Sequence, residues 1–236
     1  MKKLIVTGSF FVFPFLSCTT TRNILSSGGN GSLSEGEIVQ GLKEALRTAT
    51  DSATFHLGLL NGFYGDDIIR IVMPPEAQKV EKTLRDVGFG KTVDQVIISM
   101  NKAAEDASKY VEYIFVNSIK QMTIQDALGI LKGGDFAATD YLKRTTTIQL
   151  TTAFKPIVSK SLEYVNATKY WKDVFTVYNR FSSNPVNTDL TEYVTQKTLD
   201  GLFYHIGLEE QKIRKNPAER VTDILKKVFG NQSSRG

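Results

Sequence analysis

The sequence contains few of the residues that most enzyme and metal-site classes require. One residue is cysteine, one is tryptophan and two are histidine. A lone thiol cannot form an intrachain disulfide, nor can it supply the several sulfur ligands of a structural zinc site. Neither His56 nor His205 follows a glutamate by three residues, and His-Glu-x-x-His and Gly-x-Ser-x-Gly are also absent. We therefore expect no metal and no cofactor, and nothing here points to an enzyme.

A strong excess of one charge is also missing. The chain has 29 Lys and Arg against 25 Asp and Glu, a net charge of +4. Lys2 and Lys3 lie in the first 17 residues, which contain no acidic residue, so the rest of the chain carries +2. Its basic residues are scattered and form no Arg-rich arm. This balance predicts that nucleic acid is not a partner.

The N-terminal apolar segment is too short to cross a membrane. From Leu4 to Leu16 it covers about 13 residues, whereas a membrane span needs about 20. Lys2 and Lys3 precede it, and Ser17 separates it from Cys18. A basic start, a short apolar segment and a small residue at the cleavage site are typical of an export signal. Because a cysteine follows that site, we interpret residues 1–17 as a lipoprotein signal peptide and Cys18 as the lipidated residue.

Residues 18–33 predict a flexible linker, because Thr, Ser, Gly and Asn dominate them. Such a linker spans roughly 20 Å as a coil. We expect an acyl anchor on Cys18 to hold a periplasmic domain at a membrane of the bacterial cell envelope. The residue after Cys18 is Thr19 and not Asp, and this favours anchoring in the outer membrane. An ordinary secreted protein with an incidental cysteine is the alternative.

Helical periodicity dominates residues 34–230, and no shift in composition divides them. We expect one all-α domain, an irregular bundle of about eight helices, followed by a disordered tail at 231–236. Expected helices cover 34–57, 76–87, 93–119, 126–132, 136–165, 169–181, 189 to at least 206, and 216–230. Residues 66–73 are expected to be an extended segment packed on helices.

Several residues should define where these helices begin and bend. Ser34 with Glu37 fits a capping box, and Asp135 is expected to cap the helix that follows it. Pro156 should kink or split that helix. Pro217, after Asn216, should be the first residue of the last helix.

The same segments contain motifs that are similar to those of a known family. They are SEGEIVQGLKEAL (34–46), IKQMT (119–123), DALGILKGGD (126–135), AAT (137–139), LTEYVT (190–195), GLF (201–203), EE (209–210), IR (213–214), NP (216–217) and KKVFG (226–230). Together they resemble the domain-of-unknown-function family numbered 4197. The resemblance implies a helical domain of bacterial envelope proteins, often lipid-anchored. It implies no activity and no functional residues.

The charged residues in or near the motif-rich segments are the best candidates for a polar site. We select Glu105, Asp126, Asp135, Arg214 and Arg220 as a buried network lining a cleft. The alternative is a solvated surface of ion pairs, since Glu210 and Arg214 are four residues apart on one helix face.

Two functions of different class remain open. Helices bent at Pro156 and Gly207 would enclose an apolar cavity for a lipid or another hydrophobic ligand, lined by some of the 14 Phe and 9 Tyr. The alternative for these aromatic residues is that they only fill the core. The second function is a structural lipoprotein that docks to an envelope protein through an exposed helix face. A mostly apolar cavity of about 300 Å³ or more favours the first, and a flat apolar patch favours the second.

Overall fold

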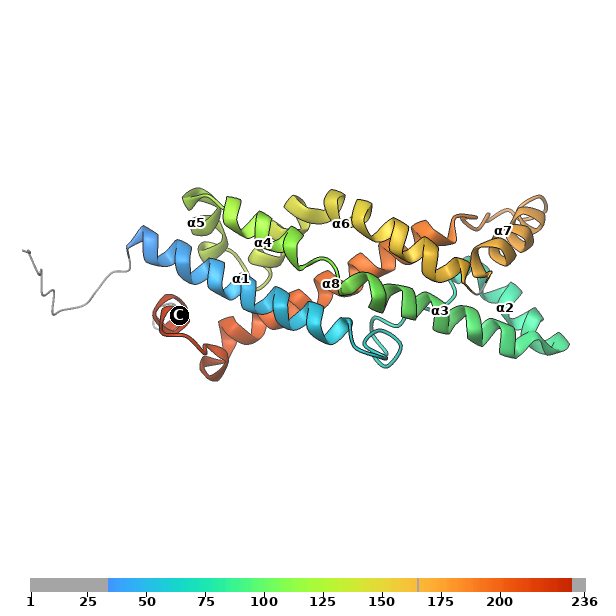
Figure 1. Ribbon diagram of the computed structural model, residues 1–236, viewed down its shortest axis with the longest axis horizontal. Coiled ribbons are helices and arrows are strands. Elements are labelled where there is room, and N and C mark those ends of the chain that lie inside the picture. The colour runs from blue at the N-terminus through green and yellow to red at the C-terminus, as the bar shows by residue number, and fades with distance from the viewer. Residues whose placement is uncertain (1–33, 165, 231–236) are drawn as a thin grey trace, which may run out of the picture. The chain divides into compact units, whose positions relative to one another are not determined.

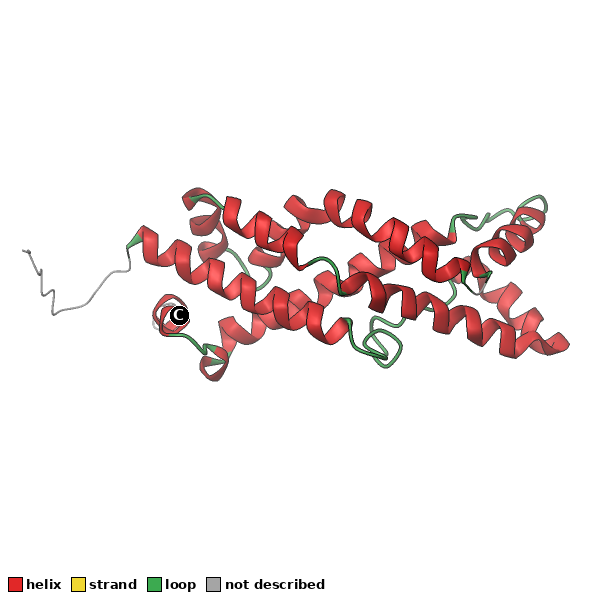
Figure 2. Ribbon diagram, viewed as in Figure 1, coloured by secondary structure: helices red, strands yellow, loops and turns green. Residues whose placement is uncertain are grey.

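Every regular element in the computed structural model is helical (Figure 2). The structure describes residues 34–164 and 166–230, which contain no strand. The predicted all-α bundle is therefore confirmed. The signal peptide, Cys18, the linker and the C-terminal tail lie outside the described residues, so those predictions stay predictions.

Within the described residues there are nine α-helices, close to the eight expected (Figure 1). They are α1 (Glu35–Leu57), α2 (Gln78–Leu84), α3 (Gly90–Ser108), α4 (Glu112–Gln121), α5 (Ile124–Lys132), α6 (Ala137–Glu163), α7 (Ala167–Tyr178), α8 (Leu190–Lys215) and α9 (Asp223–Gly230). Short helical turns add η1 (Pro75–Ala77), η2 (Arg85–Phe89) and η3 (Pro217–Glu219).

Local capping signals fix the start of three helices. The Ser34 side chain accepts from the Glu37 amide and the Glu37 carboxylate accepts from the Ser34 amide, which makes the predicted capping box of α1. Thr123 and Asp126 form the same arrangement at α5, and Asp189 accepts from the Glu192 amide at α8. Each contact satisfies an amide group that has no partner inside its helix.

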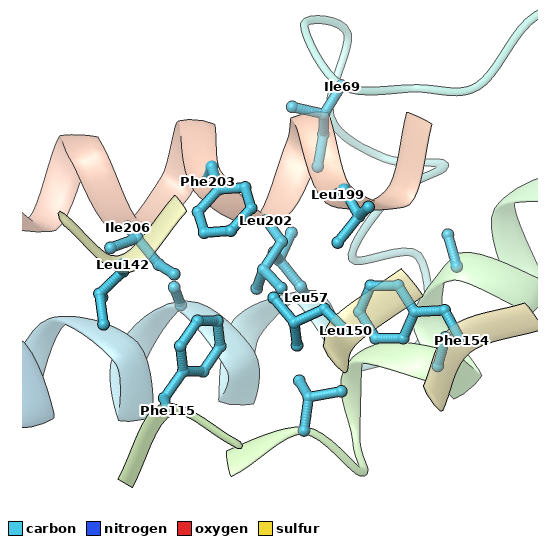
Figure 3. Close-up of a cluster of buried hydrophobic side chains, with 14 of the residues drawn as sticks. Leu57, Ile69, Phe115, Leu142, Leu150, Phe154, Leu199, Leu202, Phe203 and Ile206 are labelled. Atoms are coloured by element: carbon cyan, nitrogen blue, oxygen red, sulfur yellow. The ribbon is translucent and has the colours of Figure 1, made fainter. Parts of the chain in front are cut away.

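The core lies where α1, α3, α4, α6 and α8 meet. The long helices α6 and α8 pack along each other, and α8 also packs against α1 and α3. Ala103, Ala104 and Ala107 of α3 are fully buried, so α3 can approach its neighbours closely. Figure 3 shows the centre of this core, where leucine, isoleucine and phenylalanine side chains from several helices interdigitate.

The predicted single helix over residues 93–119 is wrong, because the chain leaves helical geometry between Ser108 and Glu112. The break separates α3 from α4, and no Gly or Pro marks it. Val111, inside the break, and Phe115, after it, are both fully buried. The apolar periodicity therefore continues across the break, since it records which face is buried and not whether the helix is continuous.

The predicted start of the last helix is also wrong. Pro217 begins only the short turn η3, and α9 starts at Asp223. Arg220 interrupts helical geometry with φ −84° and ψ 70°. Its buried guanidinium donates to the carbonyl oxygens of Ile213 (3.0 Å) and Arg214 (2.8 Å) at the end of α8. For the Arg220 side chain to donate to these carbonyl oxygens, the chain must reverse its direction at Arg220 toward the end of α8.

The two positions expected to bend helices leave them continuous. Helix α6 runs through Pro156, so the predicted split is absent. Proline removes one amide donor, and the residue four positions earlier, Thr152, is exposed, so water can reach its carbonyl. Helix α8 runs through Gly207, where an added Cβ would lie 3.0 Å from the Phe136 ring. The missing side chain at Gly207 therefore lets the Phe136 ring pack closely against α8.

The predicted extended segment over 66–73 is confirmed only in part: residues 67–69 form a turn, closed by a hydrogen bond from the Arg70 amide to the Asp66 carbonyl (2.9 Å), whereas residues 70–73 form no helix or turn. Polar contacts as well as burial fix this segment. Ile69, Ile71 and Met73 are buried. The Asn101 side chain accepts from the Ile71 amide and donates to the Ile71 carbonyl, both at 2.8 Å. On the other side of this segment, the Tyr193 hydroxyl of α8 donates to the Val72 carbonyl (2.8 Å).

The Tyr193 contact predicts a loss of stability at high pH. Burial, and after it the charge of Glu76, raise the pKa of Tyr193 from 10.0 to about 12. The neutral phenol thus stabilises the fold fully below about pH 10, and this contribution is lost as the pH rises through about 12. In urea unfolding between pH 9 and 12, wild type should lose more stability than Tyr193→Phe. The control is Tyr110→Phe, because Tyr110 is exposed, and this variant should lose stability with rising pH as wild type does. If the free energy of unfolding fell equally with pH in all three proteins, the prediction would be contradicted.

Candidate functional site

An apolar cavity of about 610 Å³ lies between α2, α3 and α7. Helix α2 contributes Val80 and Leu84, helix α3 contributes Val93 and Val96, and helix α7 contributes Trp171 and Val174, among others. Glu81, Thr92, Gln95 and Asn166 supply most of the polar lining. A mostly apolar hollow with a few polar groups is the usual form of a small-molecule site.

Helix α7 forms the rigid wall of this cavity. Trp171 is buried, and its indole nitrogen donates to the Asn187 carbonyl (2.8 Å). Its ring centroid lies 4.4 Å from that of Phe175, which also lines the cavity. Helical periodicity predicts a helix over 169–181 but does not show that its Trp171 side is a cavity wall, because that depends on where α2 and α3 lie. Since Trp171 is the only tryptophan, its fluorescence reports on this site.

Helix α2 forms the loosely packed wall. No residue of α2 is buried, and Val80 and Leu84 are only partly covered. The turn after it, η2, exposes Val87 and contains Gly88 at φ 93°, a conformation that glycine adopts without strain. Few packing contacts hold this wall, so it is the side on which a ligand can enter with the least disruption.

Among the described residues, one side chain that is charged at neutral pH lines the cavity, and it is already paired. The Glu81 carboxylate accepts from Arg85 Nε (3.0 Å) and Nη2 (2.9 Å). Arg85 Nη1 donates to Asp94 of α3 (2.8 Å). Hydrogen bonds to Asp94 and Glu81 raise the pKa of Arg85. Arg85 thus joins α2 to α3 across the Gly88 turn.

The polar residues selected from the sequence lie elsewhere, and only some of them come together. Arg214 forms a buried ion pair with Glu210, with Nη2 and Nε both 2.8 Å from Oε1, and donates to the Ile130 carbonyl (3.1 Å). Arg220 reaches the backbone carbonyl of Arg214. Asp135 is at the edge of this group, where it pairs with Lys215.

Glu210 is the centre of this group, and sequence reasoning recognised it only as the partner of Arg214. Its Oε1 accepts from the Ala138 amide (2.9 Å), and its Oε2 accepts from the Thr139 amide (2.8 Å) and hydroxyl (2.7 Å). Glu210 therefore caps α6 from another helix, and the prediction that Asp135 caps α6 is wrong. The hollow beside Glu210 and Arg214 measures about 10 Å³, enough for one water molecule at most.

The other two selected residues are separate from this group and from the cavity. Asp126 caps α5 through Thr123 and lies 3.7 Å from Arg144. Hydrogen bonds from the Thr123 side chain and backbone lower the pKa of Asp126. Glu105 is buried in α3 and accepts from the Phe63 amide (3.2 Å). Each of these contacts orders a turn or a helix end, and neither residue lines the cavity between α2, α3 and α7.

A second hollow of about 710 Å³ lies beside the C-terminal end of α1 and the start of α4. It is a shallow surface depression with a mixed lining that includes Asp51, Phe55, Leu59 and Glu112. Burial, and after it the charge of Glu112, raise the pKa of Asp51. The exposed Phe55 and Leu59 are relevant to the docking alternative.

No helix in residues 34–164 and 166–230 combines the length and hydrophobicity that a membrane span requires. No group of three or more His, Cys, Asp or Glu side chains in the same residues is arranged to hold a metal ion.

The fold and the cavity define an all-α protein without a recognisable catalytic constellation in the described residues. The family described as "Protein of unknown function (DUF4197)" matches residues 32–230, so the chain belongs to this family. The resemblance found in the sequence is thereby confirmed. Among curated proteins and among solved structures, no match was found.

Proposed function

We propose that this protein is an envelope lipoprotein whose helical domain binds a small hydrophobic molecule between α2, α3 and α7. The observation that carries the proposal is the apolar cavity of about 610 Å³. The space is partly open to solvent, and its volume lies in the range of ligand sites, about 300–1,000 Å³.

Exposed apolar side chains around the cavity support the same reading. Phe89 is 56% exposed, Tyr170 is 53% exposed and Val174 is 37% exposed, and all three line the cavity. Aromatic residues that served only to fill the core would be covered, as Phe154 is. A bound hydrophobic molecule would remove part of this exposed apolar surface from water, which favours binding.

The proposed location rests on the N-terminal sequence. A basic start, a short apolar segment and Cys18 support export and acylation, with the helical domain in the periplasm and the anchor in the outer membrane. The intact mass of the processed protein tests this. We expect a chain that begins at Cys18 and carries fatty acyl groups, and any other N-terminus, or an unmodified one, would contradict it.

Filling the cavity should abolish ligand binding. We expect native mass spectrometry of the purified protein to show a co-purifying hydrophobic molecule, and Val174→Phe to lose it because the larger side chain occupies the cavity. The matched control is Val177→Phe on the same helix, since Val177 is exposed and does not line the cavity. When a hydrophobic probe is titrated in and Trp171 fluorescence is followed, wild type and Val177→Phe should bind the probe and Val174→Phe should not. A well-folded wild type that holds no ligand and binds no probe would contradict the proposal.

Docking to an envelope protein is the second candidate, and the shallow hollow beside α1 favours it. Phe55 is 66% exposed there, and Leu60, in the following turn, is 84% exposed. Contiguous exposed apolar residues often mark interaction sites. If docking is the function, replacing Phe55 and Leu60 by serine should impair the role of the protein in the cell, whereas Val174→Phe should not.

A further inference from the structure

The cavity between α2, α3 and α7 offers no uncompensated opposite charge to an ionic ligand. Among the described residues that line it there is no Lys or Arg. Its one carboxylate, Glu81, is 20% exposed and already holds Arg85. A ligand anion would thus find no cation, and a ligand cation would find a carboxylate whose charge is compensated.

The ion-pair cluster beside the cavity also has an unequal charge. It consists of Glu81, Arg85 and Asp94, in which one guanidinium serves two carboxylates. Its formal charge is therefore −1, and the member that lines the cavity is an acid. The cluster opposes an anion, and its only cation is held at 2.8–2.9 Å by both carboxylates.

We propose that this cavity accepts uncharged hydrophobic molecules and rejects anionic ones, and that the Glu81–Arg85 pair adds to this selectivity. The inference rests on the proposed function, because it concerns the same cavity. A charged group loses its hydration on entering an apolar site, and without a compensating partner this loss opposes binding. A neutral ligand of the same shape loses far less, and its apolar surface still favours binding.

Two fluorescent probes with the same ring system test the inference. N-phenyl-1-naphthylamine is neutral, and 1-anilinonaphthalene-8-sulfonate adds a sulfonate to the same rings. Titrated into the full-length protein, with Trp171 quenching as a second readout, the neutral probe should bind at least about tenfold more tightly. Equal or tighter binding of the sulfonate would overturn the inference.

Variants of Glu81 and Arg85 test whether their ion pair contributes to the preference for the neutral probe. Glu81→Gln removes the acid from the lining. It should reduce the ratio of the affinities for the neutral and the anionic probe about two- to fivefold, the effect expected of a partly exposed charge. Arg85→Gln leaves both carboxylates uncompensated and should widen the preference. Asp86→Asn is the control, because Asp86 is exposed on the same segment and does not line the cavity.

The outcomes separate this inference from the function on which it rests. If both probes bind with equal affinity and Val174→Phe blocks both, the cavity binds hydrophobic molecules but the charge selectivity is wrong. If Glu81→Gln, Arg85→Gln and Asp86→Asn all keep the wild-type preference, the ion pair does not set it. If neither probe binds the folded wild type, the proposed function fails and this inference fails with it. Circular dichroism establishes that each variant is folded.

Discussion

Replacement of Glu210 by alanine should lower the free energy of unfolding by about 3–5 kcal/mol, because it leaves a buried charge without its partner. Arg214, whose side chain is 9% exposed, would lose the carboxylate that it now contacts through two nitrogens. In the same step the Ala138 and Thr139 amides would lose their acceptor. The start of α6 would then be buried without a cap, which adds to the cost.

The neighbouring residue provides the matched control. Glu209 is also a glutamate on α8, but it pairs with Lys212, whose side chain is 54% exposed. Glu209→Ala should therefore cost no more than about 1 kcal/mol. Urea unfolding followed by far-ultraviolet circular dichroism measures the free energy of unfolding of both variants. The comparison holds if the two variants have the same m-value. A loss for Glu210→Ala no larger than that for Glu209→Ala would show that the buried cluster does not hold α6 in place.

A second variant separates the ion pair from the cap. Arg214→Met removes the guanidinium but leaves the Glu210 carboxylate on the amides of α6, where a negative charge is favourable. We expect it to cost less than Glu210→Ala, because fewer buried groups lose a partner. The reverse order would show that the ion pair with Arg214 matters more than the cap.

The contrast between Glu210 and Ser34 shows which caps the sequence reveals. Ser34 and Glu37 are three residues apart, so their spacing alone predicts the capping box of α1. Glu210 caps α6 although it is 72 residues from Ala138 in the sequence. Asp135, which the sequence predicts to cap α6, instead pairs with Lys215. A cap supplied by another helix depends on how the helices pack, and no local pattern encodes that.

The sequence predicts an apolar cavity enclosed by helices bent at Pro156 and Gly207, but the cavity lies between α2, α3 and α7, and neither position lines it. The space arises instead because α2 carries too few apolar residues to pack fully against α3 and α7. Val80 and Leu84 line the cavity from α2, and helical periodicity alone does not show how completely such a face is packed.

Phe115→Ala should lower the free energy of unfolding by about 3–5 kcal/mol, the cost of a large cavity in a packed core. Phe115 is fully buried on α4, and its ring meets that of Phe203 of α8 edge-on, with centroids 6.4 Å apart. Figure 3 shows both rings inside the apolar cluster. On the same helix, Tyr113 is 60% exposed, so Tyr113→Ala is the matched control and should cost far less.

The same variant separates the core from the proposed ligand site. Phe115 does not line the cavity between α2, α3 and α7, so the folded variant should bind the neutral naphthylamine probe with wild-type affinity. Val174→Phe should show the opposite behaviour, with lost binding and near-normal stability, because Val174 lies at the open side of the cavity. Urea unfolding and probe titration on the two variants give four measurements. If Phe115→Ala also lost the probe, the cavity would depend on the packing of the central core and would not be an independent site.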